Sequence, residues 1–174
     1  MSEIGASHKE QILEAARRNN TELLLQIKSE LSNDDVKLSE LINTTKEIIT
    51  NNSPLHLACQ LGNWEFIDIV LDIEGVEIDP KNRAGETPLH LAVKYTNEEP
   101  EHGYFMIDNL IDAGSDPRIL DDSKLKPINY IKDNAKLKEL LESAEYAISL
   151  EHQIDIEEQE DEEDDGPSDS DSDN

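Results

Sequence analysis

An internal repeat constrains the fold of this chain more than any other feature. The segment Ser-Pro-Leu-His-Leu-Ala begins at Ser53, and Thr-Pro-Leu-His-Leu-Ala begins at Thr87, thirty-four residues later. Each segment leads into a second stretch in which apolar residues recur every three or four positions, as on one face of a helix. A repeat of this length predicts a solenoid, because a single helix–turn–helix unit cannot bury its apolar face without neighbours.

These motifs resemble the ankyrin repeat, whose pattern is Thr-Pro-Leu-His-x-Ala followed by a glycine turn and a second helix. The resemblance is strong over about residues 50–118, and its motif residues here are Pro54, His56, Pro88 and His90. It implies that both histidines are structural, with each imidazole bonding a neighbouring repeat loop. We therefore expect neither histidine to be catalytic or to bind a metal.

Weaker units flank the two clear repeats. Apolar residues between Ile12 and Ile27 are placed like the core of a first repeat, and Asp121 to Ile131 resembles a degenerate fourth. An amphipathic stretch over 137–148 predicts a closing helix. We expect residues 1–150 to form an all-α ankyrin-repeat solenoid of about four stacked units. The pattern also resembles small fungal ankyrin-repeat proteins with acidic C-termini.

Two segments depart from the repeat pattern. About six extra residues fall within 96–103, where Pro100 and Gly103 predict a break between two helices. A second insertion of about ten residues spans roughly 32–50 and is largely polar. Insertions in solenoids usually form loops on one face, so these segments are either individual features of this protein or neutral variation.

Acidic residues are concentrated at the C-terminus. The chain has 174 residues with 41 acidic and 15 basic side chains, a net charge of −26. Residues 151–174 contain thirteen acidic residues and no Lys or Arg, which predicts a disordered acidic tail. Ser168 and Ser170 each precede an aspartate by three positions, a spacing that suits an acidophilic kinase. The tail is either a solubilising segment or a binding one.

Composition excludes several classes of function. Such an acidic chain is repelled by nucleic acids and by anionic membranes, and no apolar run is long enough to span a bilayer. One cysteine, Cys59, excludes an intrachain disulfide framework and favours the reducing cytoplasm or nucleus.

No nucleophile, phosphate loop or ligand set predicts an enzyme, a cofactor or a metal; the cluster from Glu98 to His102 fits a solvated loop better. We expect a monomer.

The family resemblance implies a protein-binding groove on the concave face, formed by loop tips and first helices. Mapped onto the repeat, its candidate residues are Arg17, Arg18, Gln60, Leu61, Arg83, Glu86, Lys94 and Tyr95. The surface is locally basic within an acidic domain, and Tyr95 and Ile48-Ile49 offer apolar anchors. Alternatively, its Lys and Arg residues are ordinary solvated side chains.

Two functions fit this sequence. The first is a non-catalytic protein–protein interaction module, an adaptor that binds one partner through the groove. The second is a dedicated chaperone that shields a highly basic client, such as a ribosomal protein or a histone; it rests on analogy with small ankyrin proteins that have acidic tails. Salt discriminates between them, because tail-mediated binding weakens steeply with ionic strength.

Overall fold

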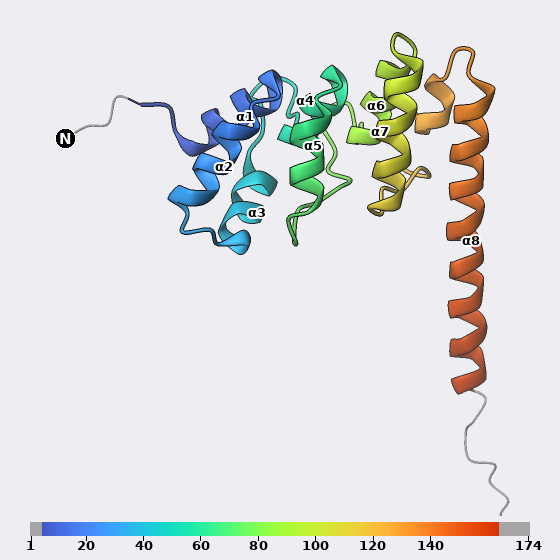
Figure 1. The fold of residues 1–174 in the computed structure, drawn as a ribbon. Helices are drawn as coiled ribbons and strands as arrows, with labels where there is room; N and C mark the ends of the chain where they lie inside the picture. Colours follow the sequence, from blue (N-terminus) through green and yellow to red (C-terminus); the bar gives the residue numbers. More distant parts are fainter. Residues whose placement is uncertain (1–4, 164–174) are drawn as a thin grey trace, which may run out of the picture.

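The computed structural model describes residues 5–163, which contain eight α-helices, one short 3-10 helix and no strand. The helices stand side by side in a row that follows the chain (Figure 1). They are α1 (His8–Arg18), α2 (Thr21–Glu30), α3 (Asp35–Thr44), α4 (Pro54–Leu61), α5 (Trp64–Leu71), α6 (Pro88–Thr96), α7 (Pro100–Asp112), η1 (Pro127–Tyr130) and α8 (Ala135–Glu163). The all-α architecture expected from the sequence is therefore confirmed.

The repeated motif begins the first helix of each central unit. Ser53 caps α4 by accepting the His56 backbone N–H, and Thr87 caps α6 in the same way from His90. A proline follows each cap at the first helical position, where its missing N–H costs nothing. Helix α4 ends at Leu61 and is capped by Gly62, whose φ of +71° is a conformation that glycine adopts without strain.

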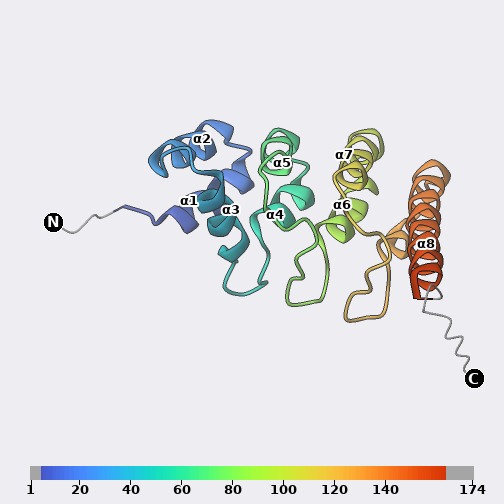
Figure 2. The same ribbon diagram turned by 90° about the horizontal axis from the view of Figure 1, so that it is seen from below.

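The units stack in two rows. Helices α1, α4 and α6 form the first row and pack one against the next, and α2, α5 and α7 form the second row. The connecting loops project from the first row on the side away from the second row (Figure 2). Apolar side chains between the rows form one continuous core. Its largest fully buried members include Ile12, Leu24, Leu55, Phe66, Leu89, Met106 and Leu137.

The polar insertion at 32–50 contains a helix that the sequence analysis did not predict. Asp34 caps α3 by accepting the N–H groups of Val36 and Lys37. Leu38 and Ile42, four residues apart, are buried against the first repeat. Two apolar residues at helical spacing are thus enough to dock α3 onto the solenoid, because the packed neighbours supply the rest of the core.

The break expected within 96–103 is shorter than predicted. Pro100 begins α7 rather than interrupting it, and Gly103 lies inside that helix. A Cβ on Gly103 would lie 2.2 Å from Thr96 Oγ1, so glycine lets α7 approach α6 closely. The extra residues therefore lengthen α7 to 13 residues, compared with 8 in α5.

Helix α8 closes the solenoid and then continues beyond it. Leu137 and Leu141 are buried against the last unit. The helix extends to Glu163, so it runs past residue 150, where the sequence predicts the start of the acidic tail. Glu and Gln are good helix formers, and they propagate a helix that the solenoid has already nucleated. Residues 164–174 lie outside the described part of the chain.

Candidate protein-binding groove

His56 joins two neighbouring repeats. Its Nδ1 accepts the Ser53 backbone N–H at 3.1 Å, so the ring proton is on Nε2, which donates to the Glu86 carbonyl at 2.7 Å. The imidazole is fully buried, and burial lowers its pKa to about 4. The neutral ring thus fixes the loop that carries Glu86 relative to α4.

His90 repeats this arrangement one unit later. Its Nδ1 accepts the Thr87 N–H at 3.0 Å, and its Nε2 lies 3.0 Å from the Leu125 carbonyl, to which it donates. Burial lowers the pKa of His90 as well. Each imidazole thus bonds a neighbouring repeat loop, and Pro54 and Pro88 begin the helices that carry His56 and His90.

Hydrogen bonds also link the loop tips to one another. Arg83 N–H donates to the Thr50 carbonyl at 2.9 Å, and Asp122 N–H donates to the Ala84 carbonyl at 3.0 Å. The Asn82 side chain adds a bond to Asn52 Oδ1 at 2.8 Å. These links place the loops that carry Thr50, Arg83 and Asp122 side by side, where the sequence predicts one wall of the groove.

An apolar pocket lies at the N-terminal end of this wall. It has a volume of about 530 Å³ between α1 and the loop at 46–50. Its lining is Lys9, Glu10, Leu13, Arg17, Lys46, Glu47, Ile48, Ile49 and Thr50. Ile48 and Ile49 leave 91% and 79% of their surface exposed. Exposed apolar side chains beside a pocket are typical of an interaction site.

Acidic neighbours engage much of the predicted basic surface. Arg17 Nη2 lies 2.7 Å from Glu47, and Arg18 Nε lies 2.5 Å from Glu14. Lys94 pairs with Glu86, and Arg83 donates to the Ile48 carbonyl at 3.3 Å. The candidate residues therefore form polar networks within the groove, and their positive charge is partly neutralised.

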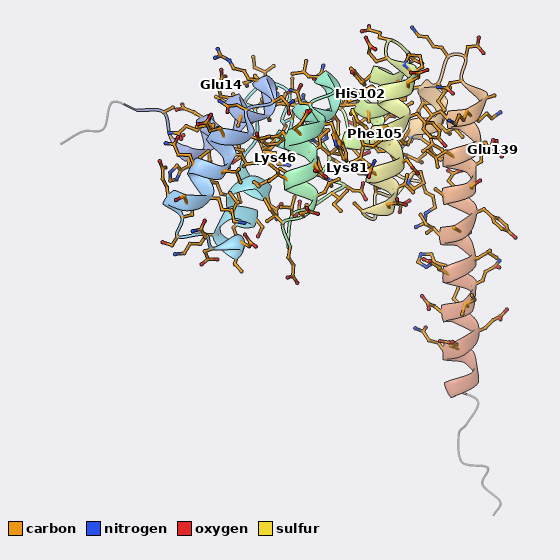
Figure 3. The ribbon with its side chains drawn as sticks, in the orientation of Figure 1. Glu14, Lys46, Lys81, His102, Phe105 and Glu139 are labelled. Atoms are coloured by element: carbon orange, nitrogen blue, oxygen red, sulfur yellow. The ribbon has the colours of Figure 1, made fainter. Side chains whose placement is uncertain are left out.

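Two basic residues of the pocket were missed by the sequence analysis. Lys9 and Lys46 line it, and neither forms an ion pair with another described residue. Figure 3 labels Lys46 beside the first repeat. The motif match to the first repeat was too weak to align Lys9 with the groove, although the position of Lys46 next to Ile48-Ile49 was a usable signal.

The remaining candidates occupy the second and third repeats. Gln60 and Leu61 are exposed at the end of α4. Tyr95 is half-buried: a Cβ on Gly62 would lie 2.3 Å from its ring, and the His102 ring lies edge-on at 5.8 Å. Tyr95 therefore packs between repeats and offers less free surface than expected.

His102 and Cys59 have structural surroundings. His102 Nε2 lies 2.8 Å from the Gly62 carbonyl, and nearby Phe105 packs edge-on against Trp64 at 4.8 Å (Figure 3). Cys59 is buried in α4, and burial raises the pKa of its thiol. Among the described residues, no three or more His, Cys, Asp or Glu side chains form a group that could hold a metal ion.

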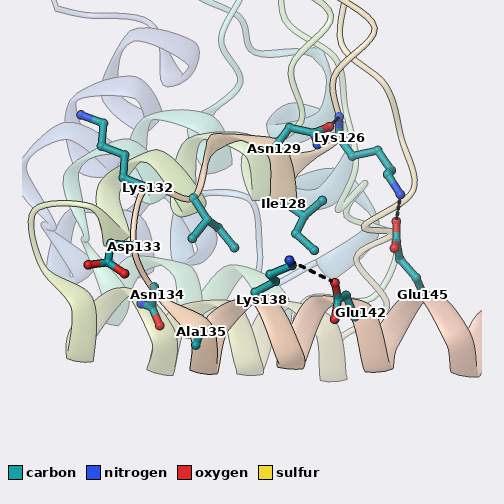
Figure 4. Close-up of a pocket in the computed structure, with 11 residues that line it drawn as sticks. Lys126, Ile128, Asn129, Lys132, Asp133, Asn134, Ala135, Lys138, Glu142 and Glu145 are labelled. Carbon is teal, nitrogen blue, oxygen red and sulfur yellow. Dashed lines mark hydrogen bonds and ion pairs between the residues drawn. The ribbon is translucent and has the colours of Figure 1, made fainter.

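A second pocket of about 580 Å³ lies between η1 and α8 (Figure 4). It is mostly polar: Lys126 pairs with Glu145 at 2.6 Å, and Lys138 pairs with Glu142 at 3.8 Å. Ile128 and Ile131 supply its main apolar surface. The pair of Lys126 and Glu145 ties the closing helix to the last unit, whereas Lys138 and Glu142 both lie within α8.

Two further findings bear on the sequence predictions. Within residues 5–163, no helix has both the length and the apolar character required to cross a bilayer. Ser168 and Ser170, the predicted phosphorylation sites, lie outside the described residues.

Comparisons with known proteins agree with this architecture. A family model of ankyrin repeats, in three copies, matches residues 12–121. An ankyrin repeat-containing protein of Saccharomyces cerevisiae is 47% identical over 152 residues, which cover 85% of this chain and 83% of the yeast protein. A Caenorhabditis elegans homolog of the transient receptor potential cation channel subfamily A member 1 is 38% identical over 60 residues, covering 34% of this chain and 4% of that protein. With its Pro-Leu-His caps and bridging histidines, the chain belongs to the ankyrin-repeat family, and its repeats form a protein–protein interaction module.

Proposed function

We propose that the protein is a non-catalytic adaptor that binds a segment of another protein along its concave groove. The observation that carries this proposal is the exposed Ile48-Ile49 pair beside the pocket between α1 and the 46–50 loop. Burying an isoleucine side chain contributes about 1.5–3 kcal/mol, so a partner that covers both gains substantial affinity. Lys9 and Lys46 at the rim favour an acidic residue beside the apolar anchor.

A chaperone for a highly basic client, such as a ribosomal protein or a histone, is the second candidate. It is favoured by the distal part of α8, where residues 149–159 are exposed and carry Glu151, Asp155, Glu157 and Glu158 without any Lys or Arg. A basic client would be attracted to this segment and shielded from other anions. In either role, we propose a monomer of the cytoplasm or nucleus.

Substitution at the pocket tests the adaptor function. The double variant Ile48→Asp/Ile49→Asp removes both anchors, and Val36→Asp is a matched control at an exposed apolar residue outside this pocket. Proteins captured from native extract by the full chain are identified and quantified by mass spectrometry. We expect partners that persist with Val36→Asp and are lost with the double variant; equal capture by both would refute groove binding.

Salt separates the two candidates within the same experiment. Raising sodium chloride from about 50 mM to about 500 mM screens exposed charges at short range. Partners held by apolar anchors remain bound, whereas basic clients held by α8 are released. A captured set that is basic, salt-sensitive and unaffected by the double variant would support the chaperone instead.

A further inference from the structure

The distal part of α8 projects beyond the rest of the molecule. Figure 1 shows its lower half extending past the ends of the other helices. Every residue from 149 to 159 is exposed, and at 1.5 Å per residue the segment from 149 to Glu163 is about 22 Å long. Closing the solenoid requires only the turns that carry Leu137 and Leu141, so the projecting turns serve no purpose in the core.

An apolar stripe runs along α8 into this projecting segment. Tyr146, Leu150 and Ile154 follow one another at four-residue spacing, which places them on one side of a helix. They leave 66%, 39% and 54% of their surfaces exposed. A highly charged helix gains nothing from such residues in water, and a regular apolar stripe with polar flanks is typical of a surface that packs against another helix.

Charge identifies the kind of helix that can pack there. From 149 to 159 the described residues include four carboxylates, Glu151, Asp155, Glu157 and Glu158, and no Lys or Arg. A second copy of this chain would bring like charges together, which disfavours pairing. A partner helix with apolar residues at the same spacing and Lys or Arg on its flanks matches both the stripe and its surroundings.

We propose that the stripe of Tyr146, Leu150 and Ile154 is a docking surface for a basic amphipathic helix of another protein. The two helices lie side by side, with the apolar residues between them and the basic flanks beside the α8 carboxylates. This surface is distinct from the pocket at Ile48-Ile49, which lies in the first repeat at the opposite end of the solenoid. Loss of binding at the groove pocket is therefore expected to leave docking at α8 unchanged.

A synthetic peptide tests the proposal on the full chain. The probe is a fluorescein-labelled Lys/Leu peptide with leucines at positions i, i+3, i+4 and i+7 of each repeat, and its control is a scrambled peptide of identical composition. The variant Leu150→Gln/Ile154→Gln removes the stripe but keeps good helix formers. Its matched control is Ile48→Gln/Ile49→Gln, which makes the same change in the groove pocket.

Fluorescence anisotropy at about 150 mM salt gives the result. We expect the patterned peptide to bind at least about tenfold more tightly than the scrambled one, and the α8 double variant to lose that advantage while the groove variant keeps it. Equal binding of both peptides, or an unchanged preference in the α8 variant, would overturn the proposal. A concentration-dependent dimer in sedimentation velocity that disappears with Leu150→Gln/Ile154→Gln would overturn it in favour of a second copy.

Discussion

The variant His56→Gln isolates the stabilising role of a neutral, buried histidine. The imidazole uses both nitrogens: it accepts the Ser53 N–H and donates to the Glu86 carbonyl. Glutamine removes the titrating ring and cannot occupy the same positions without shifting. Leaving one or both buried partners unsatisfied costs about 1–3 kcal/mol for each group. We therefore expect the free energy of unfolding at about pH 7.5 to fall by about 2–4 kcal/mol.

The same side chain makes the effect depend on pH. Burial lowers the pKa of His56 to about 4, compared with the unperturbed 6.5. Between these two pH values, the unfolded chain binds a proton at this residue and the folded chain does not. Its contribution to stability is complete above pH 6.5 and is lost as the pH falls toward 4. At about pH 5 the free energy of unfolding of the wild-type protein is about 2 kcal/mol lower because of this residue alone. The variant His56→Gln lacks this pH-dependent loss.

Urea unfolding at both pH values measures the difference. Circular dichroism follows the helices, and about pH 5 stays above the isoelectric point of about 4.3, so the protein keeps a net negative charge. Comparing the two proteins cancels the carboxylates and the remaining histidines, which both share. The difference in the free energy of unfolding between wild type and variant should decrease by about 2 kcal/mol from about pH 7.5 to about pH 5. A difference that stays constant or increases would refute the conclusion that the imidazole is buried and neutral.

Four further predictions test other parts of the structure. Gly103→Ala places a Cβ 2.2 Å from Thr96 Oγ1 and should lower the free energy of unfolding by about 1–3 kcal/mol; an unchanged urea midpoint would contradict the close approach of α6 and α7. Burial raises the pKa of the Cys59 thiol, so iodoacetamide should label it in urea but not in buffer, as intact-mass measurement will show. Truncation after Leu150 removes exposed turns and repelling charges, so the melting temperature should stay equal or rise, and a clear fall would mean that the removed segment packs on the solenoid. Ser168 and Ser170 should carry phosphate in protein from its native cell, and mass spectra with only the unmodified serines would count against an acidophilic kinase.

Local chemistry made the central repeats predictable. The caps at Ser53 and Thr87, the prolines that follow them and the glycine turn act within a few residues, so their spacing in the sequence is sufficient. The insertions were harder because their structure depends on tertiary contacts. Leu38 and Ile42 define α3 by docking on the first repeat, and Gly103 is explained by its approach to Thr96.

Prediction of the groove was limited for the same reason. The sequence placed Arg17 and Lys94 on the groove face but did not reveal that Glu47 and Glu86 would pair with them. Glu47 lies thirty residues from Arg17, and only the fold brings the two together. The extension of α8 past residue 150 does not follow from the sequence, because high net charge predicts disorder whereas the helix propensity of Glu and Gln favours a helix.

Hydrogen–deuterium exchange of the full chain with a captured partner tests the central claim most directly. Binding along the groove should slow exchange at the loop tips, at residues 46–50 and 81–86, and should leave α2 and α5 on the other row unchanged. Protection confined to α2, α5 and α7, with the loop at 46–50 exchanging as in the free protein, would contradict the proposed binding face.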